Sequence, residues 1–181
     1  MTRLAPPRLN LSEAFQRGLA CHRAGHLGEA ERLYRAILAE KPDHRGALHL
    51  LGLAAHQRGQ NEAALALIDR AIAVGDGSAE AQSSRGRILE ALRRPEDALA
   101  SFERAVALQP QEAAHHGNCG NMLLALQRFA AALACYDRAL ALYPDHPETL
   151  SNRGIALHHL GQFAAALASF DRALALAPGL A

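Results

Sequence analysis

A period of 34 residues runs through almost the whole chain and constrains its fold more than any other feature. The segment from Phe129 to Asp145 recurs 34 residues later, from Phe163 to Gly179, with 13 identities in 17 positions. Glycine recurs at the same interval without exception, at Gly18, Gly52, Gly86, Gly120 and Gly154. Because a fixed period is the signature of stacked structural repeats, the sequence predicts a repeat array and not one irregular bundle.

Residues of matching size occupy further registers of the same period. Alanine fills one register, a large side chain fills the register four residues later, and proline closes four of the five units. These residues are Ala30, Ala64, Ala98, Ala132 and Ala166, then Tyr34, Ile68, Phe102, Tyr136 and Phe170, then Pro42, Pro110, Pro144 and Pro178. Small residues let two helices approach closely, large ones fill the remaining space, and proline ends a helix. Helices of ~12–14 residues are marginal alone, so their neighbours must stabilise them.

These registers resemble the tetratricopeptide repeat, which has a Leu-Gly-x-x-Tyr pattern on a first helix and Ala-x-x-x-Phe on a second. The resemblance implies an all-α fold, a right-handed α-solenoid of five tandem 34-residue helix-turn-helix repeats. An N-terminal extension, 1–10, precedes a single predicted array, 11–180, with repeats 11–44, 45–78, 79–112, 113–146 and 147–180. The register is also similar to bacterial arrays of the O-linked N-acetylglucosamine transferase type.

Two turns depart from the common pattern. The second repeat ends in Val74-Gly75-Asp76-Gly77-Ser78, with two glycines and no proline, which predicts a looser turn. In the third repeat, Arg93-Arg94-Pro95 stands where other repeats have a turn glycine. Pro95 is compatible with the first turn of a second helix.

Charge and hydropathy exclude several classes of function. Nineteen basic residues face eighteen acidic ones, a net charge of +1, so the chain has no broad basic field that could hold nucleic acid. No apolar run reaches the ~20 residues needed to cross a bilayer, and no signal-peptide pattern begins the chain. We therefore expect no membrane insertion and a cytoplasmic location. The use of arginine for nearly all basic positions, with abundant alanine, is typical of a bacterial source.

The sequence also lacks catalytic and metal-binding patterns. It contains no glycine-rich phosphate loop and no nucleophile elbow, so we predict no enzymatic activity and no cofactor. The three cysteines have no C-x-x-C spacing and are expected to be reduced, with Cys21 and Cys119 facing the core. The ten histidines include no H-E-x-x-H motif, so they are predicted to be exposed polar residues and not metal ligands.

The resemblance implies a concave groove lined by first helices, at repeat positions 2, 5, 6, 9, 12 and 13. Asn118 and Asn152 share position 6, where a carboxamide can pair with the N–H and C=O groups of an extended chain. This pair is similar to the asparagine ladder of the O-linked N-acetylglucosamine transferases, although Gln16, Leu50 and Ser84 fill the other equivalent positions. The predicted groove residues are Phe15, His49, His56, Arg87, Glu90, Asn118, Asn121, Ser151, Asn152 and His158, with Glu148 also at a lining position.

Capture of a C-terminal carboxylate, a second binding mode known in the family, is not expected. Such clamps need lysine or arginine at positions 5 and 9. Position 5 here carries Phe15, His49, Ser83, Gly117 and Ser151. Arg87 is the only cation at position 9.

Repeat arrays normally carry a polar capping helix after the last unit. None follows the fifth repeat in this sequence, so Leu167, Phe170 and Leu174 on its second helix are predicted to form an uncovered apolar face. Three explanations fit this pattern: the array continues in a longer protein, the face associates with another copy, or its exposure is tolerated.

The predicted function is a non-catalytic protein–protein interaction module, an adaptor that binds an extended or helical peptide segment in its groove. Two alternatives remain open. The chain could be the N-terminal, substrate-presenting arm of a larger glycosyltransferase-type enzyme. It could also be a self-assembling scaffold that forms homo-oligomers through its C-terminal repeat.

Overall fold

The computed structural model describes residues 10–178, and within this range it contains ten α-helices and no strand. The chain divides into two compact units, Met1–Gly77 and Ser78–Ala181. The boundary falls in the turn for which the sequence predicts a looser structure. Residues 1–9 of the predicted N-terminal extension, the last two residues of the fifth predicted repeat, 179–180, and residue 181 lie outside the described residues.

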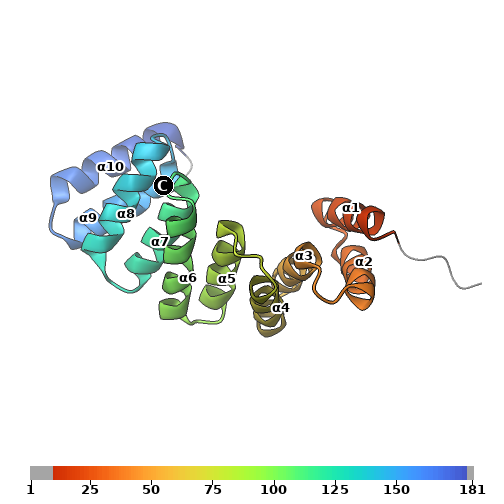
Figure 1. The fold of residues 1–181 in the computed structure, drawn as a ribbon. Helices are drawn as coiled ribbons and strands as arrows, with labels where there is room; N and C mark the ends of the chain where they lie inside the picture. Colours follow the sequence, from red (N-terminus) through yellow and green to blue (C-terminus); the bar gives the residue numbers. More distant parts are fainter. Residues whose placement is uncertain (1–9, 179–181) are drawn as a thin grey trace, which may run out of the picture. The chain divides into compact units, whose positions relative to one another are not determined.

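The first unit contains two helix pairs. Helix α1 (Leu11–Arg23) packs against α2 (Leu27–Glu40), and α3 (Arg45–Gln57) packs against α4 (Asn61–Ala73). Helix α2 also contacts α3, so the second helix of one pair adjoins the first helix of the next (Figure 1).

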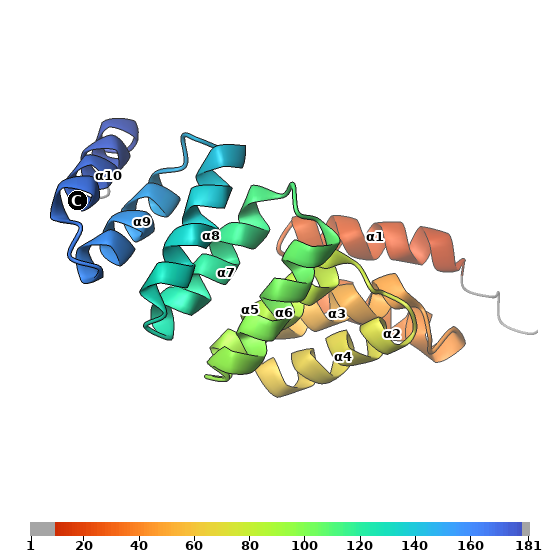
Figure 2. The ribbon, with the colours of Figure 1, turned by 60° about the vertical axis from the view of Figure 1, so that its left-hand side comes forward.

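The second unit contains three helix pairs with the same internal order. The pairs are α5 (Ala79–Ala91) with α6 (Pro95–Leu108), α7 (Ala113–Ala125) with α8 (Phe129–Leu142), and α9 (Pro147–His159) with α10 (Phe163–Leu176). Contacts of α6 with α7 and of α8 with α9 join successive pairs (Figure 2). The predicted all-α fold of tandem helix-turn-helix repeats is confirmed.

The first helices begin at regular intervals, and side-chain caps mark most of these starts. They start at Leu11, Arg45, Ala79, Ala113 and Pro147, which are 34 residues apart. Asn10 and Ser78 accept a backbone N–H as N-caps, as expected of these residue types. His44 and His146 do the same through Nδ1, which accepts from the backbone N–H three residues later at 3.1 and 3.2 Å.

The core of each pair is a close approach between a glycine of the first helix and a large side chain of the second. A Cβ atom at Gly120 would lie 2.6 Å from Cε1 of Tyr136, and one at Gly86 would lie 2.6 Å from Cε1 of Phe102. Tyr136 and Phe102 are fully buried. Only glycine therefore permits this separation of the two helix axes.

The turn inside each pair needs one residue in the left-handed region. Gly25, Gly59 and Gly161 supply it with φ near 75°. Arg93 and Gln127 occupy the same repeat position with φ of 55° and 58°. A left-handed conformation costs a non-glycine residue roughly 1 kcal/mol, so the surrounding helix packing must impose it on these two turns.

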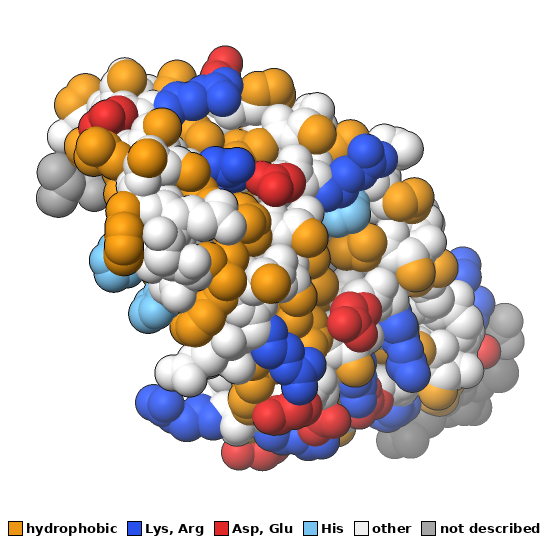
Figure 3. Space-filling view, turned by 90° about the vertical axis from the view of Figure 1, so that its left-hand side faces the viewer, with side chains coloured by type: hydrophobic (Ala, Val, Ile, Leu, Met, Phe, Trp, Pro, Cys, Tyr) orange, Lys and Arg blue, Asp and Glu red, His pale blue; other side chains and the backbone are white. Residues whose placement is uncertain are grey.

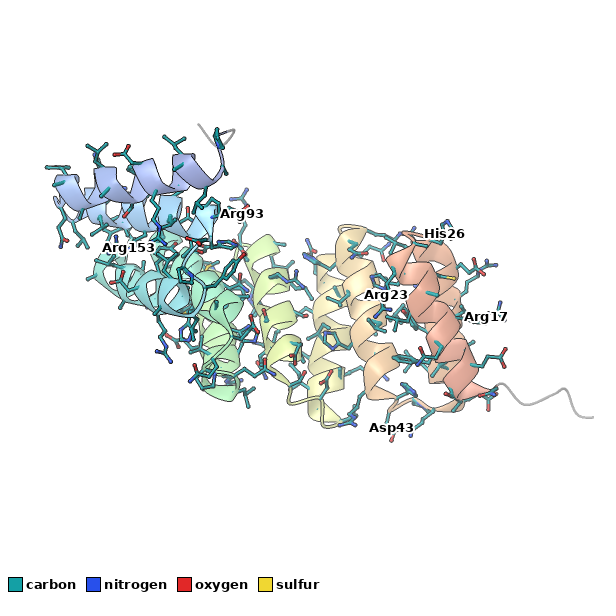
Figure 4. All side chains as sticks on the ribbon, turned by 90° about the horizontal axis from the view of Figure 1, so that it is seen from above. Arg17, Arg23, His26, Asp43, Arg93 and Arg153 are labelled. Carbon is teal, nitrogen blue, oxygen red and sulfur yellow. The ribbon has the colours of Figure 1, made fainter. Side chains whose placement is uncertain are left out.

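Polar side chains connect neighbouring helices in the second unit. Arg153 of α9 donates from Nε to Oδ1 of Asp137 on α8 and from Nη1 to Oγ of Ser169 on α10, both at 2.7 Å. Figure 4 shows Arg153 among the helices of this unit, whereas Arg17, at the same repeat position, points outwards from α1. Arg153 therefore ties the last pair to the one before it.

None of the helices in residues 10–178 combines the length and the apolar character needed to span a bilayer. Cys119 is buried, and Cys21 is half-buried against the core of the first unit, in agreement with the expected packing role of both side chains.

We predict that Gly120→Ala lowers the free energy of unfolding by roughly 1–3 kcal/mol, because the added methyl group would overlap the ring of Tyr136. Gly117→Ala on the same helix is the control, since its Cβ would meet only Oγ1 of Thr149 at an ordinary 3.9 Å. The control should be neutral or slightly stabilising because alanine favours helix over glycine. Urea unfolding monitored by circular dichroism tests both variants. Equal stability of Gly120→Ala and the wild type would contradict the packing argument.

Candidate functional site

A groove of about 500 Å³ lies in the second unit, where α7, α8 and α9 meet. Small side chains of α7 and α8 line part of it, and polar side chains line the rest. The lining residues are Gln111, Glu112, Ala113, Ala114, Gly117, Asn118, Asn121, Ala139, Leu142, Tyr143, His146, Glu148, Thr149 and Asn152. The small residues leave room for a main chain to approach the helices.

Three asparagines line this groove, and two of them are hydrogen-bonded to each other. Asn152 of α9 donates from Nδ2 to Oδ1 of Asn121 on α7 at 2.9 Å. Asn118, one turn earlier on α7, donates from Nδ2 to Oγ of Ser83 on α5 at 3.3 Å. All three asparagines that the repeat register predicts as groove residues line this groove.

A buried tyrosine fixes the central asparagine. The hydroxyl of Tyr136 donates to Oδ1 of Asn121 at 2.9 Å, and burial, followed by the Cys135 and Cys119 thiols, raises the pKa of this tyrosine. Tyr34 occupies the same repeat position in the first unit, but its buried hydroxyl has no hydrogen-bond partner within residues 10–178. Burial and the nearby Cys21 thiol raise the pKa of Tyr34 to about 12. The hydrogen bond that connects a core tyrosine to a groove asparagine is thus found in the fourth repeat and not in the first.

One end of the groove is lined by two glutamates and a tyrosine, Glu112, Glu148 and Tyr143. Glu112 and Glu148 are exposed lining residues, and Glu148 stands at a position predicted to face the groove. Sequence reasoning missed Glu112 and Tyr143, since neither falls at one of the six lining positions. The signal available for Tyr143 was a comparison of the five repeats: Lys41, Gly75, Gln109 and Ala177 stand at its position elsewhere.

The other residues predicted for this unit lie away from the groove lining. Arg87 and Glu90 are exposed on α5. Ser151 is half-buried on α9 and does not line the groove. His158 is exposed at the far end of α9, where its ring stands edge-on to His159 and Phe163, with centroids 5.9 and 5.4 Å away.

The predicted groove residues of the first unit make local contacts. Phe15 is half-buried and packs against the rings of Tyr34 and His44, with centroids 6.3 and 5.2 Å away. Nδ1 of His49 lies 3.0 Å from Oδ2 of Asp76, and Nδ1 of His56 lies 2.7 Å from Oδ1 of its neighbour Asn61. Their assignment to a groove stays a prediction.

The expectation that the histidines are exposed polar residues is wrong for most of them, because five of the ten are half-buried and two are buried. His115 and His116 are only 6% and 8% exposed. Nε2 of His115 lies 3.2 Å from Oε1 of Gln109, and Nε2 of His116 lies 2.9 Å from the carbonyl oxygen of Pro110. Both rings pack near the start of α7, so they serve the structure and not the groove surface.

The last helix carries exposed apolar side chains. Leu167 is 61% exposed, whereas Leu99, at the same repeat position on α6, is 5% exposed. Leu174 is also exposed, but Phe170 is half-buried because its ring packs on Gly154. Figure 3 views the molecule from the side where α9 and α10 lie, and hydrophobic side chains are spread over this face.

Within residues 10–178, no group of three His, Cys, Asp or Glu side chains converges to hold a metal ion. Cys119 and Cys135 face each other across α7 and α8, and the hydrogen bond with Cys135, together with burial, raises the pKa of the Cys119 thiol. This proximity arises from helix packing.

We predict opposite effects of the same substitution at the two buried tyrosines. Tyr136→Phe removes the donor to Asn121 and should cost about 1 kcal/mol of unfolding free energy. Tyr34→Phe removes a buried hydroxyl without a partner and should be neutral or stabilising. Phe102 and Phe170 show that the register accepts a phenyl ring. Thermal and urea unfolding of both variants checks this difference, and an equal loss in both would refute it.

Comparison with known proteins supports the repeat assignment. Two family models, both described as tetratricopeptide repeat, match the sequence. One covers residues 120–181, and the other covers 15–79 and 50–113, which together exceed half of the chain. No curated protein gave a significant sequence match.

Solved structures with a similar fold show low sequence identity. MamA, residues 41 to the end, from Desulfovibrio magneticus RS-1 has a TM-score of 0.85 at 18% identity, covering 94% of this chain and 96% of that chain. YrrB, described as a TPR protein with an unusual peptide-binding site, has a TM-score of 0.81 at 19% identity, covering 92% and 86%. PilF of Pseudomonas aeruginosa has a TM-score of 0.82 at 20% identity, covering 91% and 75%. The regular helix pairs and the matching family models together show that the chain belongs to the tetratricopeptide repeat family, a protein-interaction fold.

Proposed function

We propose that the chain is a non-catalytic adaptor that binds an extended peptide segment in the groove lined by α7, α8 and α9. The observation that carries this proposal is the presence of Asn118, Asn121 and Asn152 in the lining of one groove of about 500 Å³, each held by a side-chain hydrogen bond. The likeness in fold to YrrB, whose structure is described as having a peptide-binding site, is in keeping with it.

The asparagines retain hydrogen-bonding capacity for a ligand. Asn118 and Asn152 each donate one amide hydrogen bond to a neighbouring side chain, and within residues 10–178 their Oδ1 atoms accept none. Each can therefore accept a backbone N–H and donate its second amide hydrogen to a backbone C=O. Because these hydrogen bonds are made to the main chain of the peptide, they favour peptides in an extended conformation and tolerate many side chains.

Asn121 has a supporting role in this scheme. Its Oδ1 atom already accepts from both Tyr136 and Asn152, so it positions Asn152 from a buried anchor. A preorganised amide loses less side-chain entropy when a peptide binds.

We predict that Asn118→Ala with Asn152→Ala weakens peptide binding by roughly 30-fold or more, since at least two hydrogen bonds of ~1 kcal/mol each are lost. Gln162→Ala is the matched control, because Gln162 is an exposed amide at the start of α10 without a side-chain capping bond. Binding is measured by fluorescence polarisation with a peptide recovered from a random-peptide selection against the wild-type chain. Thermal unfolding of the double variant should stay close to that of the wild type. If the double variant and the wild type bind the peptide with equal affinity, the two asparagines do not contact it.

A second candidate function, self-association through the last repeat, is favoured by the exposure of Leu167 and Leu174. The equivalent surface of α8 is covered by α9. A second copy that packs on α10 would remove the same kind of apolar surface from water. The remaining alternative, a substrate-presenting arm of a glycosyltransferase-type enzyme, stays a prediction that the coding sequence beyond Ala181 would decide.

We predict that Leu167→Glu with Leu174→Glu abolishes any concentration-dependent rise in mass seen by light scattering. Phe170 is left unchanged, since its ring packs on Gly154 and its replacement would disturb the fold. Leu108→Glu is the control, because Leu108 is 52% exposed at the end of α6, outside this face. A wild-type chain that remains monomeric at all concentrations, or an unchanged mass in the double variant, would exclude assembly through α10.

A further inference from the structure

We propose that the same groove selects peptides that place a lysine or arginine side chain between Glu112, Tyr143 and Glu148. This inference rests on the proposed function, because it names the side chain that accompanies the backbone held by the asparagines. It adds a sequence preference to a groove that would otherwise read only the main chain.

The helix directions bring these three residues to one end of the groove. Glu112 occupies the N-cap position of α7, and Glu148 lies in the first turn of α9. Helices α7 and α9 are first helices of consecutive repeats, and α8, which runs back between them, ends just before Tyr143. All three side chains line the groove.

The charges at this end favour a cation. The groove lining includes two carboxylates and no lysine or arginine. Glu112 makes no side-chain capping bond, and neither Glu112 nor Glu148 has an ion-pair partner within residues 10–178. The starts of α7 and α9 contribute about half a positive charge each and the end of α8 about half a negative charge, so two full carboxylates outweigh them.

Two arginines that reach residues next to this end already bond to other side chains, and one of these partners, Gln111, itself lines the groove. Arg138 donates from Nη2 to Oε1 of Gln111 at 3.4 Å. Arg172 pairs with Asp145 at 2.9 Å. Neither guanidinium lines the groove, so the space beside Glu112 and Glu148 is open to a ligand cation.

Tyr143 adds an attraction that carboxylates alone would not provide. Its side chain is 55% exposed, and the edge-on ring of His146, with its centroid 5.8 Å away, packs beside it. An exposed aromatic face attracts an ammonium or guanidinium group. The combination of one aromatic ring and two carboxylates therefore matches a basic side chain better than an anionic or apolar one.

The test uses an array of acetylated, amidated decapeptides that are identical in composition except for one central residue, which is Arg, Lys, Gln or Glu. The full chain is compared with Glu112→Gln/Glu148→Gln and with Glu96→Gln/Glu103→Gln. The second pair makes the same change in net charge at two exposed positions of α6 outside the groove. We expect the wild type and the α6 control to bind Arg and Lys decapeptides about tenfold more tightly than Gln ones, and the groove variant to lose this preference. Tyr143→Leu should reduce the preference in part.

Each outcome separates this inference from the proposed function. If decapeptides bind without preference for Arg or Lys, or if both double variants lose the preference equally, the inference is wrong and peptide binding stands. If no decapeptide binds the wild type, both proposals are wrong. Tighter binding of Glu decapeptides would also overturn the inference, because the carboxylates would then not face the bound side chain.

Discussion

The close approach of a glycine on each first helix to a large side chain on each second helix sets the geometry on which the other features depend. The Gly86–Phe102 and Gly120–Tyr136 contacts leave no room for a Cβ atom, so each fixes the distance between the two helices of its pair. The pairs then stack through α6 with α7 and α8 with α9. Because first helices follow one another at a regular interval, their exposed positions can form a continuous wall within the second unit.

The candidate site is connected to this core by a single residue. The ring of Tyr136 packs on Gly120, while its hydroxyl reaches Asn121 at the groove. Asn121 in turn accepts from Asn152 on the next pair. Packing inside one helix pair therefore orients an amide on its neighbour, and the groove inherits the rigidity of the core. An array with phenylalanine at this position would keep the fold and lose the connection.

The fold could be predicted because its determinants recur five times, whereas parts of the site depend on departures found in one repeat. The recurring glycine and aromatic registers predicted the helix pairs, and the shared position of Asn118 and Asn152 predicted that they line a common surface. Tyr143 was missed because it lies outside the six lining positions, and only its departure from the other four repeats, none of which has an aromatic residue there, marks it. His115 was wrongly expected to be exposed, because its polarity was given more weight than its position. Repeat-equivalent residues such as Ala81 are buried, and a histidine at that position must be buried too.

Helices α8 and α10 have nearly the same sequence, differing only at Cys135 and Tyr136, where α10 has Ser169 and Phe170. On α8 this surface is covered by α9, while on α10 Leu167 and Leu174 face solvent. The sequence of α8 that packs against α9 is therefore present a second time in the chain, as α10. Lengthening such an array by gene duplication would need no new interface. A duplicate of α9 could pack on α10 as α9 packs on α8, because α10 already carries the required side chains.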